Sequence, residues 1–388
     1  MAYKNSSEYI ATPEQLAAAC RRISTCAWLA IDTEFIREKT YFPQLCLIQV
    51  GTPEAVFCID PLALASLGPL LEVFYDTRIT KVFHAARQDL EIFYHLTGDL
   101  PRPVFDTQLA AMLLGYPDQA GYATLVTEVL GVTLDKAYSR TDWARRPLPD
   151  DQLQYAADDV RYLVPLYQHL HRELAARGRL AWLDDDFAKL TDTATYRNEP
   201  ADAWQRIRGA DRLQPKSLAV LEALAAWRET AAVVQDRPRG WILRDEVLID
   251  LARLMPGSMA ELEQIRGLRR ENLQRDSNTL LDLIRSAKSR AAPATPVAAA
   301  ARLTADQQAL ADVLMAVVRL RGARESLSPA TLASRKDIEQ LLLDSGESRV
   351  LQGWRKSVVG NELLAFLHGE RRLRFADGAL QLDVSTDP

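Results

Sequence analysis

The sequence predicts an α/β domain with a mixed sheet and packed helices, followed by two all-helical domains. Short apolar runs alternate with helical patterns in the first half of the chain, whereas the patterns beyond residue 200 are helical without strands. A tight connection between two of the apolar runs adds an antiparallel hairpin to the sheet. The length of 388 residues agrees with this division, because it exceeds what one hydrophobic core usually serves.

Four short apolar runs are the expected strands of the sheet. They lie at residues 27–31, 45–50, 55–59 and 81–84. Residues 51–54, Gly-Thr-Pro-Glu, join the second run to the third, which is typical of a hairpin. Helical periods extend from Thr107 onward, so we expect helices packed on the sheet.

Helical patterns separated by Pro and Gly make up much of the second half of the chain. We expect helices at residues 202–209, 215–234, 244–254, 258–265 and 270–286. An Ala- and Pro-rich segment then interrupts the pattern and is typical of a linker. The predicted domains are residues 1–195, 205–288 and 303–388, with the linker at 289–302.

Two carboxylates, Asp32 and Glu34, follow the first apolar run directly. Side chains two residues apart on a strand share one face, so the pair projects together. Crowded carboxylates at the edge of a core repel each other and lose hydration, and no Lys or Arg lies within two residues of either one. They therefore need a cation or a proton, unless the strand has reached solvent, which is the simpler explanation of an isolated acidic pair.

A second acidic position, Asp89, follows the fourth run. Leu90, Phe93 and Tyr94 keep helical spacing, so strand 81–84 leads into a helix with Asp89 in its first turns. The helix dipole favours a carboxylate there, which alone would explain the residue, but the side chain can still face a metal.

The third acidic position, Asp159, lies in a helical pattern. Tyr155 and Asp159 are four residues apart and therefore share a helix face. Asp158 points about a quarter turn away and is the poorer candidate. Pro165 is expected to kink or end this helix beyond the acidic position.

These positions, in this order on strand, strand-to-helix turn and helix, resemble the exonuclease motifs of the DEDD superfamily, in its tyrosine-bearing branch. The surrounding segments resemble the bacterial ribonuclease D family: Asp-Thr-Glu-Phe-Ile-Arg-Glu from Asp32, Tyr-Phe-Pro-Gln-Leu-Cys-Leu-Ile-Gln from Tyr41, Phe-Asp-Thr-Gln from Phe105 and Tyr-Ala-Ala-Asp-Asp-Val from Tyr155. The resemblance implies a ribonuclease H-like exonuclease fold and a 3′–5′ exoribonuclease activity. The implied substrates are structured RNAs with single-stranded 3′ ends, such as tRNA precursors, and the implied products are nucleoside 5′-monophosphates.

The acidic residues suit hydrolysis with two metal ions. A phosphodiester needs a nucleophilic water and a neutralised leaving oxygen, and two divalent cations about 3.5 to 4 Å apart supply both. The ligands would be Asp32, Glu34, Asp89 and Asp159, and such oxygen ligands favour Mg²⁺ or Mn²⁺. By resemblance, Asp32 would bridge the ions, Glu34 and Asp159 would hold the ion that activates water, and Asp89 would act mainly through an ordered water. Tyr155, neutral at pH 7, would orient the attacking water.

Four further residues are candidate contacts to the terminal nucleotide: Phe35, Tyr41, Gln49 and His84. Phe35 could stack on a base or be a core aromatic. Gln49 could serve a backbone amide instead, and His84 is more simply a structural residue at the end of a buried strand. Asp106 has the form of a helix N-cap and stays outside the metal set.

Arginines form two further groups. The first group, Arg140, Arg145 and Arg146, lies in one loop. These arginines could be solvated or could contact phosphates, and the sequence pattern would be the same in both cases. The second group lies in segment 205–288, whose Trp-Arg-Glu-Thr from Trp227 resembles the HRDC domain shared by ribonuclease D and RecQ helicases. The resemblance implies auxiliary nucleic-acid binding, although solvated helix faces would explain the same arginines: Arg228, Arg237, Arg239, Arg244, Arg266, Arg269 and Arg270. Segment 303–388 resembles HRDC less and is interpreted as a diverged second copy.

Composition excludes two other classes of protein. Hydrophobic residues make up 48% of the chain and no apolar stretch reaches membrane-spanning length, so a disordered chain and a membrane protein are excluded. The N-terminus lacks a secretory pattern, and the four cysteines form no Cys-x-x-Cys pair, so we expect a cytoplasmic protein. We also expect a monomer. Residues 1–200 hold 19 Lys/Arg against 27 Asp/Glu, and residues 201–388 hold 28 against 25, so RNA binding needs local basic clusters.

Two alternatives stay open. One is a 3′–5′ DNA exonuclease that resembles the Werner-type domain, because recognition of the 2′-hydroxyl depends on pocket geometry. The other is a non-catalytic nucleic-acid adaptor, which the intact carboxylates and Tyr155 disfavour.

Overall fold

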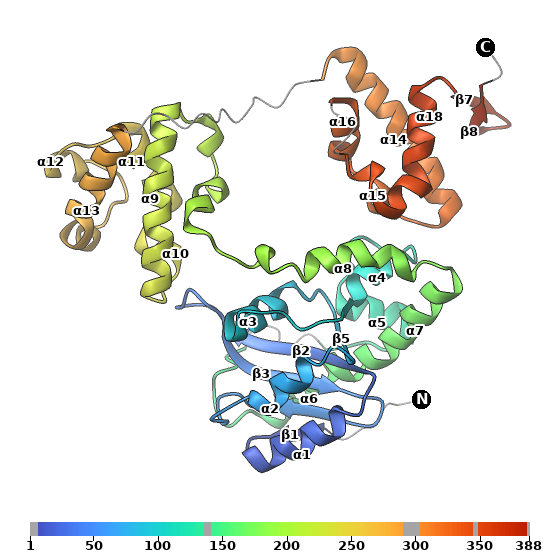
Figure 1. The fold of residues 1–388 in the computed structure, drawn as a ribbon, viewed down its shortest axis with the longest axis horizontal. Coiled ribbons are helices and arrows are strands. Elements are labelled where there is room, and N and C mark those ends of the chain that lie inside the picture. Colours follow the sequence, from blue (N-terminus) through green and yellow to red (C-terminus); the bar gives the residue numbers. More distant parts are fainter. Residues whose placement is uncertain (1–6, 136–140, 290–302, 344–347, 386–388) are drawn as a thin grey trace. The chain divides into compact units, whose positions relative to one another are not determined.

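The computed structural model describes residues 7–135, 141–289, 303–343 and 348–385 (Figure 1). The chain forms two compact units. The first contains Met1–Glu34, Leu45–Thr195 and Ala301–Pro388, and the second contains Phe35–Gln44 and Tyr196–Ala300. Each unit therefore combines segments that are distant in sequence. Arg140 and the predicted linker from residue 290 onward lie outside the described residues.

A six-stranded mixed sheet forms the centre of the exonuclease part. Its strands are β1 (Ser7–Ile10), β2 (Trp28–Ile36), β3 (Gln44–Gly51), β4 (Val56–Ile59), β5 (Thr80–Phe83) and β6 (Val104–Asp106). Their order across the sheet is β1-β4-β3-β2-β5-β6. β3 and β4 are antiparallel, whereas β1 with β4, β2 with β5 and β5 with β6 are parallel. The predicted hairpin and the mixed sheet are confirmed.

Helices cover this sheet. They are α1 (Pro13–Ile23), α2 (Gly68–Phe74), α3 (Arg87–Thr97), α4 (Thr107–Met112), α5 (Tyr122–Leu130), α6 (Asp150–Arg161), α7 (Leu163–Ala176) and α8 (Asp184–Leu190). α6 packs against the end of β3, where a Cβ at Gly51 would lie 2.9 Å from the carbonyl oxygen of Val160. Only glycine permits so close an approach of helix and strand. α6 ends at Arg161, before Pro165, as the sequence predicts.

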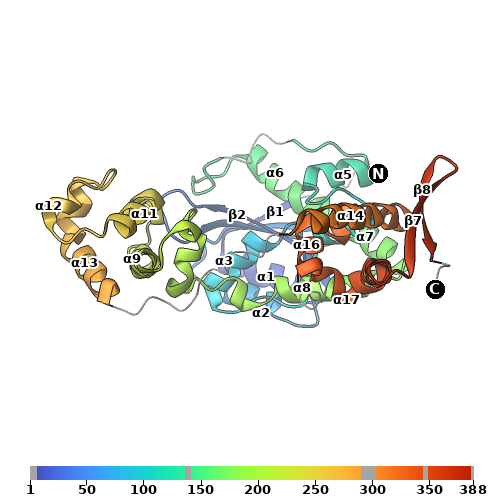
Figure 2. The ribbon, with the colours of Figure 1, turned by 90° about the horizontal axis from the view of Figure 1, so that it is seen from above.

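The C-terminal helices belong to the same compact unit. They are α14 (Ala305–Glu325), α15 (Pro329–Leu332), α16 (Arg335–Leu343), α17 (Gly353–Arg355) and α18 (Asn361–Leu367). The ring of Trp354 stacks on Trp182 with centroids 4.7 Å apart and planes 2° apart, and Arg355 of α17 lies 3.6 Å from Asp186 of α8. Figure 2 shows the ribbons of α17 and α8 in the view from above. These contacts join the C-terminal helices to the exonuclease part.

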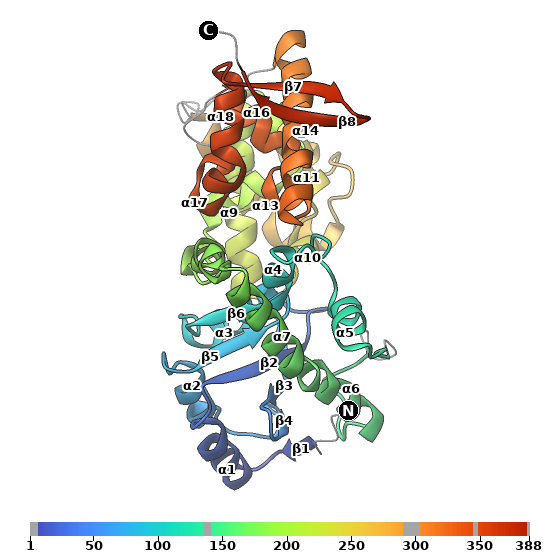
Figure 3. The ribbon, with the colours of Figure 1, turned by 90° about the vertical axis from the view of Figure 1, so that its right-hand side faces the viewer.

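The prediction that residues 303–388 are all helical is wrong at the C-terminal end. Strands β7 (Arg371–Ala376) and β8 (Ala379–Val384) form an antiparallel hairpin (Figure 3). Asp377 and Gly378 connect them with φ angles of 53° and 75°, as a two-residue hairpin turn requires. The Asp-Gly pair between alternating apolar residues is a hairpin signal that the helical interpretation overlooked.

The second unit is a helical bundle with two long helices, α9 (Pro215–Val234) and α13 (Arg270–Ser289), of 20 residues each. Its shorter helices are α10 (Arg239–Ile242), α11 (Asp245–Leu254) and α12 (Met259–Leu262). Apolar side chains of α9, α11 and α13 form its core, with Leu224, Leu248 and Leu280 fully buried. The helix predicted at 215–234 is confirmed, whereas a 3₁₀ segment, Pro200–Arg206, replaces the helix predicted at 202–209. No helix among the described residues of either unit is long and apolar enough to span a membrane.

Candidate metal centre

Three carboxylates meet where strand β2 faces helix α6. Asp32 and Glu34 come from β2 and Asp159 from α6, and one carboxylate oxygen from each lies within 4.8 Å of the others. The alternation of side chains along β2 puts its two acidic residues on one face, and α6 supplies the third. The residues predicted from sequence as metal ligands on these two elements therefore lie together.

Burial makes this group unfavourable for negative charge. The pKa of Asp32 is well above its usual range because of burial and the nearby charge of Asp159. Burial and three neighbouring carboxylates, those of Asp32, Asp159 and Asp89, raise the pKa of Glu34 to about 10. Burial raises the pKa of Asp159 to about 7. A divalent cation would supply the missing positive charge, and an all-oxygen donor set fits a hard cation such as Mg²⁺ or Mn²⁺.

Asp89 stands beside this group in the first turn of α3. Its carboxylate is buried and accepts a hydrogen bond of 2.5 Å from the hydroxyl of Thr33, which lies between the two acidic residues of β2. Burial, followed by the charge of Asp32, raises its pKa well above the usual range. Its place outside the close group of three fits a residue that reaches a metal through water.

Asp106 holds the turn that leads to Asp89. Its carboxylate caps α4, accepting from the backbone N–H of Gln108 and Leu109 at 2.8 and 3.3 Å, as the sequence predicts. It also accepts from the backbone N–H of Ala85 and Ala86 at 3.2 and 2.9 Å. Ala85 has a φ of 57°, a conformation that alanine rarely adopts, so this carboxylate stabilises a strained turn. The sequence showed only the N-cap role of Asp106, because the second pair of donors, Ala85 and Ala86, lies 21 and 20 residues away.

Tyr155 lies one turn before Asp159 on α6. Burial, followed by the negative charge of Asp159, raises the pKa of its hydroxyl. The hydroxyl therefore stays protonated at neutral pH and can donate or accept a hydrogen bond near the carboxylates. On the same helix, Asp158 is paired with Arg161 and bound by Gln154, which agrees with its exclusion from the metal set.

The candidate nucleotide contacts have different surroundings. Tyr41 is buried within the second unit, where its hydroxyl donates to Glu229, which favours a structural role, and its nucleotide contact stays a prediction. Gln49 is fully buried, and neither of its amide atoms has a hydrogen-bond partner among the described residues. His84 places Nδ1 3.0 Å from the hydroxyl of Thr107, and burial lowers its pKa, which favours the structural interpretation. Phe35 is half-buried directly after Glu34.

Two of the seven arginines of the first HRDC-like segment form ion pairs within the domain. Arg228 is buried and lies 2.6 Å from Asp245, and Arg239 binds Glu229. The remaining five are exposed and keep the predicted capacity for phosphate contacts: Arg237, Arg244, Arg266, Arg269 and Arg270.

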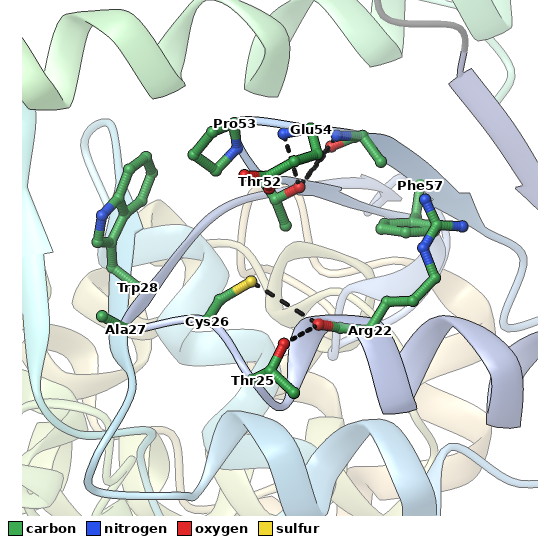
Figure 4. A pocket seen from close by; sticks show the side chains of 10 residues that line it. Arg22, Thr25, Cys26, Ala27, Trp28, Thr52, Pro53, Glu54 and Phe57 are labelled. Carbon is green, nitrogen blue, oxygen red and sulfur yellow. Dashed lines mark hydrogen bonds between the residues drawn. The ribbon is translucent and has the colours of Figure 1, made fainter.

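A pocket of about 470 Å³ lies at the beginning of β2 (Figure 4). Trp28 and Phe57 are among its aromatic lining residues, and Cys26 and Glu54 add polar groups. The guanidinium of Arg22 already lies 4.6 Å above the ring of Phe57. None of the metal-centre carboxylates lines this pocket, so it is distinct from the metal centre.

Comparisons with known proteins agree with this geometry. A family described as "3'-5' exonuclease" matches residues 7–175, and the HRDC domain family matches residues 217–284. Ribonuclease D of Acidiphilium cryptum is 42% identical over 366 residues, covering 93% of each chain. Ribonuclease D of Granulibacter bethesdensis is 38% identical over 370 residues, 94% of this chain and 93% of the relative.

Solved structures show the same fold. The crystal structure of Escherichia coli RNase D, described as an exoribonuclease involved in structured RNA processing, matches with a TM-score of 0.82 and 34% identity over 94% of this chain and 99% of that one. The catalytic core of RRP6 from Trypanosoma brucei matches with a TM-score of 0.59 and 24% identity over 74% of this chain and 81% of that one, which concerns the fold alone. The HRDC match ends at residue 284, so the second HRDC-like copy stays a prediction.

Proposed function

We propose a mechanism for this chain, which belongs to the ribonuclease D family and is a 3′–5′ exoribonuclease. Asp32, Glu34, Asp89 and Asp159 hold two divalent metal ions, Mg²⁺ or Mn²⁺, and Tyr155 orients the attacking water. The observation that carries the proposal is the group of three carboxylate oxygens within 4.8 Å of one another, each from a residue whose pKa is raised. When bound, the ions would make a water nucleophilic near neutral pH and neutralise the leaving oxygen.

The protein groups have separate tasks in this proposal. Asp32 would be the ligand shared by the two ions, and Glu34 and Asp159 would hold the ion that activates the water. Asp89, whose carboxylate accepts a hydrogen bond from Thr33 and lies outside the close group of three, would contribute through a water. The neutral hydroxyl of Tyr155 fixes the direction of attack by a hydrogen bond rather than by removing a proton, since its pKa is raised.

The proposed substrates are structured RNAs with single-stranded 3′ ends, tRNA precursors among them, and the products are nucleoside 5′-monophosphates. Support comes from the similarity to E. coli RNase D, which is described as an exoribonuclease involved in structured RNA processing. We further propose a cytoplasmic monomer. The four free cysteines, Cys20, Cys26, Cys46 and Cys58, support a reducing compartment.

The test uses a tRNA precursor labelled within its 3′ trailer and a DNA strand of the same sequence. We expect release of labelled mononucleotides from the RNA with Mg²⁺ or Mn²⁺ and none with chelator. Tyr155→Phe should lower kcat on the order of 100-fold, as loss of a transition-state hydrogen bond does, without changing the metal concentration for half-maximal activity. Preference for the DNA strand would contradict the RNA substrate, and full activity of Tyr155→Phe would contradict the role of the tyrosine.

A further inference from the structure

The loop before helix α6 is fixed by an ion pair with the end of strand β4. Nε and Nη2 of Arg146 lie 2.6 and 2.7 Å from the two carboxylate oxygens of Asp60. The carboxylate is almost fully buried, with 1% of the Asp60 side chain exposed. The hydroxyl of Tyr9 donates a third hydrogen bond to it. Burial by itself raises the pKa of Asp60, but the hydrogen bonds from Arg146 and Tyr9 outweigh it and lower this pKa below its usual value. The Asp60–Arg146 pair is therefore ionised at neutral pH.

The remaining N–H groups of Arg146 bind backbone carbonyls. Nη1 donates to the carbonyl oxygens of Trp143 and Arg145 at 2.7 and 2.8 Å, and Nη2 donates to that of Cys46 at 2.7 Å. A guanidinium has five N–H donors, and these contacts use all of them. Arg146 therefore organises its own loop, and the sequence-based alternative of a phosphate contact does not apply to it.

The residue that this arrangement fixes is Trp143. Its indole is buried, and its ring centroid lies 6.3 Å from that of Tyr155, with the planes 34° apart. This separation is within the range of aromatic pairs in contact. Trp143 thus forms a wall beside the ring that carries the hydroxyl proposed to orient the attacking water.

We propose that Asp60 and Arg146 are positioning residues, which hold Trp143 in place and thereby set the direction of the Tyr155 hydroxyl. The inference rests on the role proposed above for Tyr155. Arg146 binds the backbone carbonyl of Trp143 and is itself held by Asp60, so the backbone that carries the indole is fixed. A tyrosine ring turns about two side-chain bonds, and a buried indole on a fixed backbone restricts that motion. Because a displacement of about 1 Å at a catalytic group can cost on the order of 100-fold in rate, loosening the wall should lower kcat more than it raises KM.

The experiment compares substitutions in the whole chain with and without Tyr155→Phe. Trp143→Leu, which removes the aromatic wall, is expected to lower kcat about 30-fold with KM changed less than about twofold. Arg146→Lys keeps the charge but loses the two-pronged contact and should lower kcat about tenfold. Trp143→Phe retains a ring and should keep most of the activity. Arg172→Lys, at an exposed position on α7, is the control for loss of an arginine and should change kcat less than about twofold.

The decisive measurement is the double-mutant cycle. If Trp143 acts through the tyrosine hydroxyl, Trp143→Leu should lower kcat less than about threefold once Tyr155 is already phenylalanine. An equal loss in both backgrounds would overturn the inference, and so would a rise in KM without a fall in kcat for Arg146→Lys. If Trp143→Leu does not fold, the same cycle with Arg146→Lys decides. A Tyr155→Phe variant with unchanged kcat would instead contradict the proposed role of Tyr155 itself.

Discussion

Two groups of charged side chains, one in each compact unit and each at least partly buried, have opposite electrostatics. In the metal centre, the charged neighbours that shift Glu34 are carboxylates, and together with burial they raise its pKa to about 10. In the second unit, Glu229 is 1% exposed, and burial by itself raises its pKa. Hydrogen bonds from Arg239 and Tyr41 outweigh burial, so the pKa of Glu229 is lower than usual. A buried carboxylate with partners in the chain stabilises the fold, whereas one that faces other carboxylates is suited to a cation from outside.

The cluster around Glu229 fixes the segment that follows the metal motif in the chain. Arg239 donates to both carboxylate oxygens of Glu229, at 2.5 and 2.6 Å, and to the hydroxyl of Tyr41 at 3.0 Å. The backbone N–H groups of Tyr41 and Phe42 both donate to Asp236, at 3.0 and 3.2 Å. Residues 35–44, directly after Glu34, are thus part of the helical unit rather than of the exonuclease part.

The largest expected effect is the loss of activity when a metal-centre carboxylate becomes an amide. Asp32→Asn should lower kcat on the order of 1,000-fold or more, because it removes the proposed bridging ligand and the charge that attracts the ions. Asp158→Asn is the matched control on the neighbouring helix, since Asp158 is already paired with Arg161, and should stay within about threefold of the unchanged protein. Mononucleotide release at saturating Mg²⁺ measures both, and similar losses for the two variants would contradict the assignment.

The second prediction concerns Glu229, whose charge is compensated by Arg239. Glu229→Gln leaves Arg239 without its counter-charge and should lower the free energy of unfolding by about 2 kcal/mol. This value is below the usual range for a fully buried pair, because 35% of the Arg239 side chain is exposed. Asp282→Asn, which breaks the exposed pair with Arg285 in the same unit, should cost less than about 0.5 kcal/mol.

Urea unfolding of the whole chain measures both variants. Equal losses would show that burial of Glu229 contributes nothing beyond an ordinary surface pair, and the contrast between the two groups would then fail.

Sequence patterns were sufficient where a residue's role depends on its own strand or helix. The spacing of Asp32 and Glu34 on a strand, and of Tyr155 and Asp159 on a helix, predicts which side chains project together. Alternation and the Asp377–Gly378 turn would also have revealed the C-terminal hairpin, which the helical interpretation missed.

Other roles depend on partners far away in the chain, which no local pattern contains. Tyr41 and Glu229 are 188 residues apart, and Asp60 and Arg146 are 86 apart. A tyrosine beside the motif therefore suggested a nucleotide contact, and an arginine in a loop suggested a phosphate contact. In the fold, each of these side chains is hydrogen-bonded to a buried carboxylate, Tyr41 to Glu229 and Arg146 to Asp60.

The third prediction is a pH dependence of stability without metal. The pKa of Asp159 is about 7 in the folded chain, above the usual value of about 4 in an unfolded chain. Because the folded chain binds this proton more tightly, Asp159 contributes its full stabilisation at pH values below its pKa in the unfolded chain. This stabilisation is lost as the pH rises to the pKa in the folded chain. Between about pH 4 and 7, this group should therefore lower the free energy of unfolding by about 1.4 kcal/mol per pH unit.

Urea unfolding in chelator at pH 5.5 and 7 measures this effect, and Asp159→Asn is the control that removes the share of Asp159. We expect Asp159→Asn to stabilise the metal-free protein at pH 7, and saturating Mg²⁺ to weaken the pH dependence of the unchanged protein by favouring the ionised carboxylate. A metal-free stability that changes between pH 5.5 and 7 by the same amount in Asp159→Asn and in the unchanged protein would contradict the raised pKa of Asp159.

The smallest expected effect concerns a third buried carboxylate, Asp106, which four backbone N–H groups satisfy. Because the Asp106 carboxylate has hydrogen-bond donors within the chain, it resembles Glu229 rather than the metal centre. The turn that Asp106 stabilises is strained at Ala85, where the backbone φ is 57°. Ala85→Gly should relieve about 1 kcal/mol of steric cost, but the greater entropy of the unfolded chain should offset about half of this gain. The variant should therefore be about 0.5 kcal/mol more stable. Ala86→Gly, at the next residue with an ordinary helical φ of −52°, should instead destabilise the protein by about 0.5 to 1 kcal/mol. Thermal unfolding distinguishes these opposite signs, and two destabilising substitutions would show that the turn at Ala85 carries no strain.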